Sequence, residues 1–154
     1  MNKLEQRALN IYNNLKGHHR DPFNMETAQV FIITENEQFQ IVGVHQDVYQ
    51  GLEALTRISK DPIMRQMRCI GLETCGWAAP VSQDDDETPP SMHRYRRRCR
   101  LITIIDRNME CASTIGFSDD PDDIVTDGGK ARGALDDSLK GAMACIIRNQ
   151  ATSN

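Results

Sequence analysis

The chain has few aromatic residues and no long apolar run. Only 5% of its 154 residues are aromatic, and Trp77 is the single tryptophan. No stretch approaches the roughly 18 to 20 apolar residues that a membrane-spanning helix needs, and residues 1–16 are polar where a signal peptide would be apolar. The sequence therefore predicts a cytoplasmic protein without a membrane segment.

Motifs of the common enzyme classes are also missing. The sequence contains no P-loop, no dinucleotide-binding glycine fingerprint, no nucleophile elbow and no H-E-x-x-H zinc motif. None of the five cysteines forms a C-x-x-C pair, and four of them fall in predicted strands. Because a cysteine in a reducing compartment behaves as a small buried hydrophobe, packing is favoured over metal, redox or nucleophilic roles. We expect no cofactor and no metal site.

Length and charge are those of one ordinary domain covering residues 1–154. A chain of this size buries most of its unfolded surface without disulfides or metals. The formal net charge of −4 provides no overall attraction for nucleic acid or an anionic membrane. A local patch of opposite charge still acts within a Debye length of about 8 to 10 Å.

Hydrophobic periodicity predicts helices and strands in the order αββαβββα. The predicted segments are an opening helix between Leu4 and Leu15, strands at 27–34 and 39–45, a helix from Asp47 that ends before Pro62, strands at 67–77, 95–106 and 110–118, and a final helix through Leu135 and Ile146. Acidic or polar loops are predicted at 82–92 and 118–129. We therefore expect an α+β fold, a mainly antiparallel five-stranded sheet with three helices that cover one face.

This order of elements resembles the roadblock, longin and profilin-like group of five-stranded sheets. The resemblance is topological and covers the predicted elements from Lys3 to Arg148. It implies that homodimerisation through a sheet edge or through helices is open to this chain. It carries no motif, so no function follows from it.

A second resemblance rests on an ordered string of motifs between Glu73 and Leu139. The string is Thr74-Cys75-Gly76-Trp77-Ala78-Ala79-Pro80, then Pro90-Ser91-Met92-His93, Arg96-Arg97-Arg98-Cys99-Arg100-Leu101, Phe117-Ser118-Asp119-Asp120-Pro121 and Val125-Thr126-Asp127. It is similar to a set of small uncharacterised proteins of actinobacteria and their phages, which share a G-W-A-A-P stretch, a histidine, an arginine triplet and an acidic loop. That resemblance implies a grouping and no mechanism.

Five arginines and a histidine lie within eight residues, a concentration of positive charge that the rest of the acidic chain does not share. If 95–106 is extended, alternate side chains share one side of the strand, which predicts a row of four arginines on one face: Arg94, Arg96, Arg98 and Arg100. Tyr95, Arg97, Cys99 and Leu101 would then point to the other face. Such a row can hold phosphate bidentately, with Tyr95 stacked beside it.

Three interpretations of the arginine cluster stay open. The acidic segments Asp84–Glu87, Asp119–Asp120 and Asp122–Asp123 are near in sequence and can neutralise the arginines. This proximity favours ion pairing as the first interpretation. A protein partner is the second interpretation, and phosphate or nucleic acid is the third. Exposed ion pairs contribute only about 0 to 1 kcal/mol each, so stability alone is a weak reason for such a cluster.

Trp77, His93 and the acidic loops each have a structural and a functional interpretation. Trp77 before two alanines and a proline favours a buried position at a strand end, and the alternative is a stacking surface. His93 is the candidate general acid or base if catalysis exists, with arginines as anion stabilisers. The spacing of aspartates at 119–127 does not match a calcium loop, which favours a solvated turn. His18 and His19 receive no role.

These observations favour a small non-enzymatic interaction or regulatory module, of the kind found among accessory proteins of phages or mobile elements. Its predicted binding residues are Trp77, His93, Arg94, Tyr95, Arg96, Arg98 and Arg100. A protein partner is expected ahead of nucleic acid, and no membrane partner is expected. A nucleotide- or nucleic-acid-binding protein and a small enzyme built on His93 are the alternatives.

Overall fold

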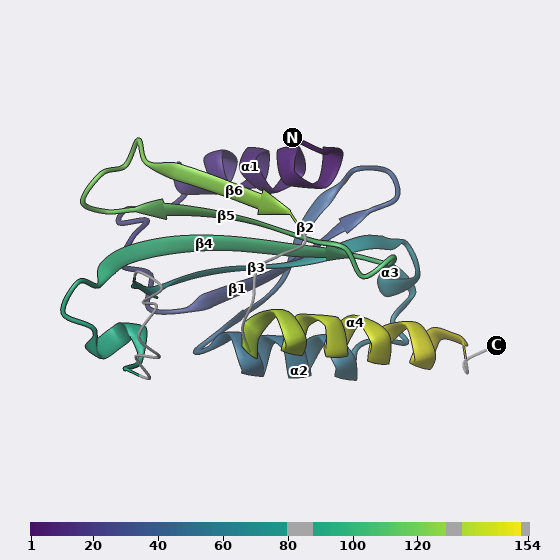
Figure 1. Ribbon diagram of the computed structural model, residues 1–154. Helices are drawn as coiled ribbons and strands as arrows, with labels where there is room; N and C mark the ends of the chain where they lie inside the picture. Colours follow the sequence, from purple (N-terminus) through teal and green to yellow (C-terminus); the bar gives the residue numbers. More distant parts are fainter. Residues whose placement is uncertain (80–87, 129–133, 152–154) are drawn as a thin grey trace.

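The computed structural model describes residues 1–79, 88–128 and 134–151 and shows an α+β fold with one antiparallel sheet (Figure 1). The elements in chain order are α1 (Lys3–Lys16), β1 (Ala28–Thr34), β2 (Phe39–His45), α2 (Val48–Arg57), α3 (Pro62–Arg65), β3 (Met67–Ala78), the 3-10 helix η1 (Pro90–Met92), β4 (Arg97–Asp106), β5 (Cys111–Phe117), β6 (Ile124–Gly128) and α4 (Ala134–Ala151). The predicted fold class is confirmed.

The strands lie in the order β2-β1-β3-β4-β5-β6, and every neighbouring pair is antiparallel. β2 and β6 are the two edges of this sheet. β3 and β4 form its centre and pair continuously from Cys69 opposite Asp106 to Ala78 opposite Arg97. The long central ladder carries the sheet to the end where the arginine cluster begins.

Helices cover both faces of the sheet rather than the single face that was predicted. α1 packs against β4, β5 and β6 on one face, and α2 and α4 lie side by side on the other (Figure 1). The reason lies in β4, where Ile102 and Ile104 face α1 while Ile105 faces the opposite layer. Strands that are apolar on both sides need cover on both sides.

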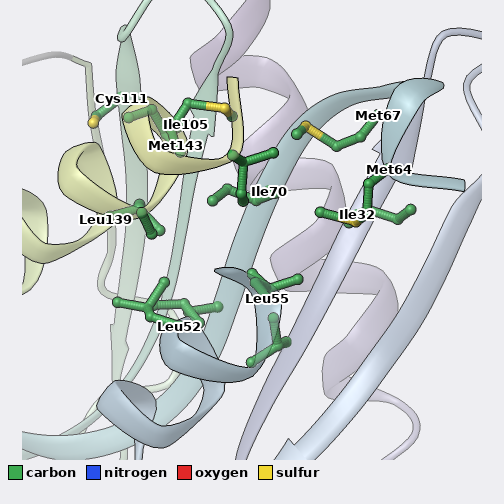
Figure 2. Close-up of a cluster of buried hydrophobic side chains, with 14 residues drawn as sticks. Ile32, Leu52, Leu55, Met64, Met67, Ile70, Ile105, Cys111, Leu139 and Met143 are labelled. Carbon is green, nitrogen blue, oxygen red and sulfur yellow. The ribbon is translucent and has the colours of Figure 1, made fainter. Parts of the chain in front are cut away.

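The larger of two hydrophobic clusters fills the space between the sheet and the helices α2 and α4. Figure 2 shows Leu52 and Leu55 of α2 and Leu139 and Met143 of α4 gathered around Ile70 of β3. All five side chains are almost completely buried. Burial of one such side chain stabilises the fold by about 1.5 to 3 kcal/mol, so this layer contributes strongly to stability.

The opening helix and the second helix start where the sequence places them, because a polar side chain satisfies the first turn of each. Asn2 and Glu5 form a reciprocal capping box at the start of α1. At the start of α2 the Asp47 carboxylate accepts a 2.8 Å hydrogen bond from the backbone N–H of Gln50. These bonds satisfy N–H groups that a helix leaves without internal partners.

The structure has six strands rather than five, because residues 124–128 pair with β5 inside the segment that was predicted to be an acidic loop. Ile124 packs against the cluster under α1. The hydroxyl oxygens of Thr126 and Thr114 lie 3.0 Å apart across the two strands. β6 is only five residues long, so its alternation of half-buried and exposed side chains is a weak signal. The aspartates that precede it are typical of a loop, and the strand was therefore not predicted.

A short helix, α3, was also missed. Pro62 was expected only to end the preceding helix, whereas it is the first residue of α3. The Asp61 carboxylate caps α3 by accepting a 3.0 Å hydrogen bond from the N–H of Ile63. Proline suits the first helical position because the N–H that it lacks would have no internal partner. None of the helices in the described ranges is long and apolar enough to cross a membrane.

Candidate functional site

The predicted binding residues gather where β3 ends and β4 begins. Trp77 is directly opposite Arg98, and Cys75 is directly opposite Arg100. Opposite residues of an antiparallel pair point to the same face of the sheet. Arg100 lies over the ring of Tyr12 in α1, so this is the face that α1 covers.

The predicted row of four arginines on one strand is not formed, because β4 begins at Arg97 rather than Tyr95. Residues 94–95 form a turn that follows η1, and the N–H of Arg96 donates to the carbonyl of His93 at 3.2 Å. Strand alternation therefore applies to Arg98 and Arg100 only. Arg94 and Arg96 are placed by the turn.

Arg100 is an interior residue and not part of a surface. Both Arg100 and Glu73 are completely buried, and their side chains form an ion pair in which the Arg100 Nε lies 3.0 Å from Glu73 Oε2. A second Arg100 nitrogen donates to the carbonyl oxygen of Tyr12 at 3.0 Å. With no exposed surface, Arg100 cannot contact a partner directly, and its role is to hold α1 against the sheet.

His19 completes this buried network. Its Nε2 lies 2.7 Å from the other carboxylate oxygen of Glu73. From the sequence, no role was predicted for His19, and Glu73 was not singled out. Strand alternation nevertheless places Glu73 on the same face as Cys75 and Trp77. An acidic residue inside an otherwise apolar strand was the signal, because a buried carboxylate requires partners.

The segment after α1 is attached to the same end of the sheet. The Sγ of Cys75 donates to the carbonyl of Pro22 at 3.1 Å, and Nε of Arg98 donates to the carbonyl of Phe23 at 2.9 Å. Burial raises the pKa of the Cys75 thiol, which keeps it protonated and able to donate. The Cys99 thiol is buried, and its pKa is raised for the same reason. The packing role predicted for cysteine is confirmed for Cys99, and also for Cys69 and Cys111, whose side chains are buried.

Trp77 is not buried, so the interpretation that favoured a core position is wrong. Its side chain is 40% exposed, and the guanidinium carbons of Arg96 and Arg98 lie 4.9 and 5.3 Å from the centre of its ring. β3 runs past the end of the helical cover, which leaves the indole at the rim. Two cation–π contacts of this kind contribute about 0.5 to 1 kcal/mol each at an exposed site and hold the ring in place.

Tyr95 and its neighbours form a second aromatic and cationic group beside Trp77. Tyr95 is 61% exposed, with the guanidinium of Arg94 5.0 Å from its ring centre. The His93 ring lies 5.9 Å from the Tyr95 ring, and its Nδ1 accepts a 3.0 Å hydrogen bond from the N–H of Tyr95. One ring nitrogen of His93 is therefore engaged in shaping the turn.

Arg97 is neutralised by the acidic loop, so the ion-pairing interpretation is confirmed for this residue. Its guanidinium lies 2.7 Å from Asp119 and 3.0 Å from Asp123, and it covers the ring of Phe117 at 3.7 Å. The guanidinium holds the pKa of the Asp119 carboxyl below its usual value, and the carboxylates raise the pKa of Arg97. Asp84 to Glu87, the other acidic segment predicted to pair with the cluster, lie outside the described residues.

Comparison with known proteins adds no relative. No family model matches the chain, and neither the curated proteins nor the solved structures contain a match. Among the described residues, no group of three or more histidine, cysteine or acidic side chains is arranged to hold a metal ion.

The exposed members of the cluster, with the half-buried Arg98, form one candidate site, which we call the Trp77 surface. It consists of Trp77, Arg94, Tyr95, Arg96 and Arg98. Within the described ranges, no carboxylate lies in salt-bridge distance of Arg94 or Arg96. The surface therefore offers two aromatic side chains and the guanidinium groups of three arginines to a binding partner.

Proposed function

We propose that the protein is a non-enzymatic interaction module that binds another protein through the Trp77 surface. The observation that carries this proposal is the exposed indole of Trp77, which the guanidinium groups of Arg96 and Arg98 contact. Tryptophan, tyrosine and arginine are the residues most enriched among those that dominate binding energy at protein interfaces. An exposed tryptophan fixed in this way is prepared for contact before the partner arrives.

The arrangement is also rigid, which reduces the entropic cost of binding. Trp77 and Arg98 belong to the central strands β3 and β4, and Arg98 is further tied to the carbonyl of Phe23. Side chains that are already ordered lose less freedom on association. The fitting partner presents an apolar or aromatic side chain to Trp77 and Tyr95, with acidic groups beside it for Arg94 and Arg96.

Nucleic acid is the second candidate, and the exposed rings of Trp77 and Tyr95 beside arginines are the observation that favours it. Single-stranded nucleic acid binds to aromatic side chains that stand beside positive charges. However, the charge of Arg97 is neutralised by Asp119 and Asp123, and that of Arg100 by Glu73. Three arginines remain on a chain of net charge −4, which supports a protein partner over a phosphate backbone.

The test is affinity capture of the full tagged chain from a host lysate, with and without nuclease, followed by identification of bound proteins. We expect a stoichiometric protein that survives nuclease and is lost from the Trp77→Ala and Arg96→Glu variants. Tyr49→Ala is the matched control, because Tyr49 is 54% exposed on α2, away from the Trp77 surface. Loss of the partner in all three variants, or capture that disappears with nuclease, would contradict the proposal.

Nuclease-sensitive capture would be followed by a titration of the purified chain with single-stranded oligonucleotides. The emission of Trp77, the only tryptophan, reports directly on stacking. An affinity that falls steeply with salt concentration would replace the protein partner with nucleic acid.

A further inference from the structure

The edge strand β2 lacks a helix on the α1 side of the sheet, among the elements that the structure describes, whereas Phe31 and Ile33 of β1 are buried against α1. α2 covers β1 and β2 on the opposite face, whereas α1 sits over β4, β5 and β6. Six strands spaced about 4.8 Å apart span roughly 24 Å, and one helix is about 10 Å across. A single helix is too narrow to cover this face.

A groove runs along the uncovered flank of α1. One part is a cavity of about 520 Å³ between Ile11, Asn14 and Leu15 of α1 and Phe39, Gln40 and Ile41 of β2. A second cavity of about 480 Å³ shares Ile11 and Phe39 and continues toward the start of α1. α1 has 14 residues, so the joined groove follows a helix about 21 Å long.

The edge strand beside the groove exposes apolar side chains. Phe39, Ile41 and Val44 are 41%, 44% and 56% exposed. Ile41 and Val44 share a face, because they pair with Phe31 and Gln29, alternate residues of β1, across an irregularity in the register. The strand from Phe39 to His45 contains no lysine, no acidic residue and no proline, the side chains that commonly protect an exposed edge.

The outer side of α1 next to the groove carries amides in place of charges. Gln6, Asn10, Asn13 and Asn14 are exposed there, in a chain of which 26% is charged. The ionisable groups along the groove lie toward its ends, where Arg7 and Glu37 form an ion pair with each other at 2.7 Å, Lys3 lies near the start of α1, and His18 follows its end. Depletion of charge marks the centre of protein interfaces.

We infer that this groove, with the exposed face of β2, is the interface between two copies of the chain related by a two-fold axis. A two-fold interface brings a surface against itself, so the surface must be self-complementary. Apolar side chains meet this condition, and amides do too, because each both donates and accepts hydrogen bonds. The Trp77 surface fails it, since arginines would face arginines.

The spacing along β2 is also compatible with the two-fold relation. Ile41 pairs with Phe31, while Phe39 and Val44 pair with Ile33 and Gln29, each two positions from Phe31 along β1, so Ile41 lies midway between Phe39 and Val44. Antiparallel approach of two copies therefore brings Phe39 of one copy toward Val44 of the other, with Ile41 near the axis. This interface is separate from the Trp77 surface, and its test does not depend on the proposed function.

The experiment is sedimentation of the full chain over a wide concentration range, at low and at high salt. We expect an assembly of twice 17.4 kDa, with an affinity that changes little with salt because the interface is mainly apolar and amide, and Arg7 and Glu37 already pair with each other within one copy. Ile41→Asp and Val44→Asp place like charges across the axis, and each is expected to weaken association by at least about tenfold. Val125→Asp, on the opposite edge strand at 50% exposure, is the matched control and leaves the assembly intact.

A charge-swap experiment tests the two-fold relation itself. Ile41→Asp and Ile41→Lys are each expected to sediment as monomers, and an equimolar mixture is expected to restore the dimer. Circular dichroism confirms that each variant is folded, and Val44→Asp serves if an Ile41 variant is not. A wild-type chain that stays monomeric at every concentration overturns the inference, as does a dimer that Ile41→Asp and Val44→Asp leave unchanged.

Discussion

The completely buried guanidinium of Arg100 forms an ion pair with the completely buried carboxylate of Glu73, on the sheet face beneath α1. His19 binds the remaining carboxylate oxygen, and the carbonyl of Tyr12 takes another guanidinium donor. This network ties β3, β4, α1 and the segment after α1 together at the end of the sheet that carries the Trp77 surface. It supports the candidate site from inside without being part of it.

Removal of one member of this ion pair is expected to destabilise the protein strongly. Glu73→Ala leaves a buried guanidinium without its counter-charge, which lowers the free energy of unfolding by about 3 to 5 kcal/mol, and Arg100→Met has a similar effect. The double variant Glu73→Leu with Arg100→Met should recover most of the loss, because no uncompensated charge remains. Urea unfolding of the three variants measures this, and a double variant no more stable than the single ones would contradict the prediction.

Close packing of Tyr12 against Gly116 predicts a second effect on stability. A Cβ atom at position 116 would lie 1.9 Å from the Tyr12 hydroxyl oxygen, so Gly116→Ala is expected to cost about 1 to 3 kcal/mol. That hydroxyl is buried and has no hydrogen-bond partner among the described residues. Tyr12→Phe should therefore be neutral or stabilising, and it should partly rescue Gly116→Ala. Thermal unfolding of the two single variants and the double variant measures these effects. A double variant that is no more stable than Gly116→Ala would argue against the contact between Tyr12 and position 116.

The protein is expected to lose stability at alkaline pH. Burial raises the pKa of Cys69, Cys75 and Cys99 above 9.0, and that of Tyr12 above 10.0. Because the folded state holds these protons more tightly than the unfolded state, their contribution is complete below pH 9 and is lost as pH rises through the raised values. The midpoint of thermal unfolding should fall across this window, and less so in Tyr12→Phe. A midpoint that stays constant from pH 8 to well above pH 10 would count against it.

Acid should weaken the contact between Arg97 and the loop after β5. Arg97 lowers the pKa of Asp119 below 3.8, so the contribution of this pair is present above pH 3.8 and is lost as pH falls through the lowered value. Asp119→Asn is expected to remove this part of the acid dependence. Unfolding curves of the wild type and the variant should converge at low pH, and curves that remain equally far apart would disprove the assignment.

Fluorescence provides a direct check on the position of Trp77. An indole that is 40% exposed should emit at long wavelength in the native protein and should be quenched by acrylamide. Arg96→Ala removes a guanidinium 4.9 Å from the ring and should increase the quenching. Arg68→Ala, an arginine paired with Glu37 elsewhere on the sheet, is the control and should leave the quenching unchanged. Native emission at short wavelength, insensitive to acrylamide, would show that the ring is buried.

Most of the fold was predictable because its signals are local. The β1–β2 and β4–β5 hairpins follow from β-branched runs separated by short polar segments, and α1, α2 and α4 follow from apolar residues at helical spacing. β6 and α3 escaped because each is short and its composition, aspartates in one case and a proline in the other, is typical of a loop. The second helical layer escaped because a strand pattern does not reveal which of its two apolar sides a helix will cover.

The candidate site was predictable in location but not in arrangement. The density of arginines between His93 and Leu101 pointed to the segment that carries the candidate site, and the predicted pairing with an acidic loop occurs at Arg97. Whether each arginine is buried, paired with a carboxylate or exposed depends on residues far away in the chain. Arg100 is interior because Glu73 and Tyr12 meet it, while Trp77 is exposed because the helices end before it.

The sequence by itself determined the class of fold, the positions of most strands and helices, and the segment that concentrates positive charge. These properties arise from periodicity and propensity, which act over a few neighbouring residues. Only the tertiary structure decided which arginine is buried, which is neutralised and which stays available at the surface. Those outcomes depend on whether a carboxylate, a carbonyl or solvent faces each guanidinium once distant strands and helices have packed together.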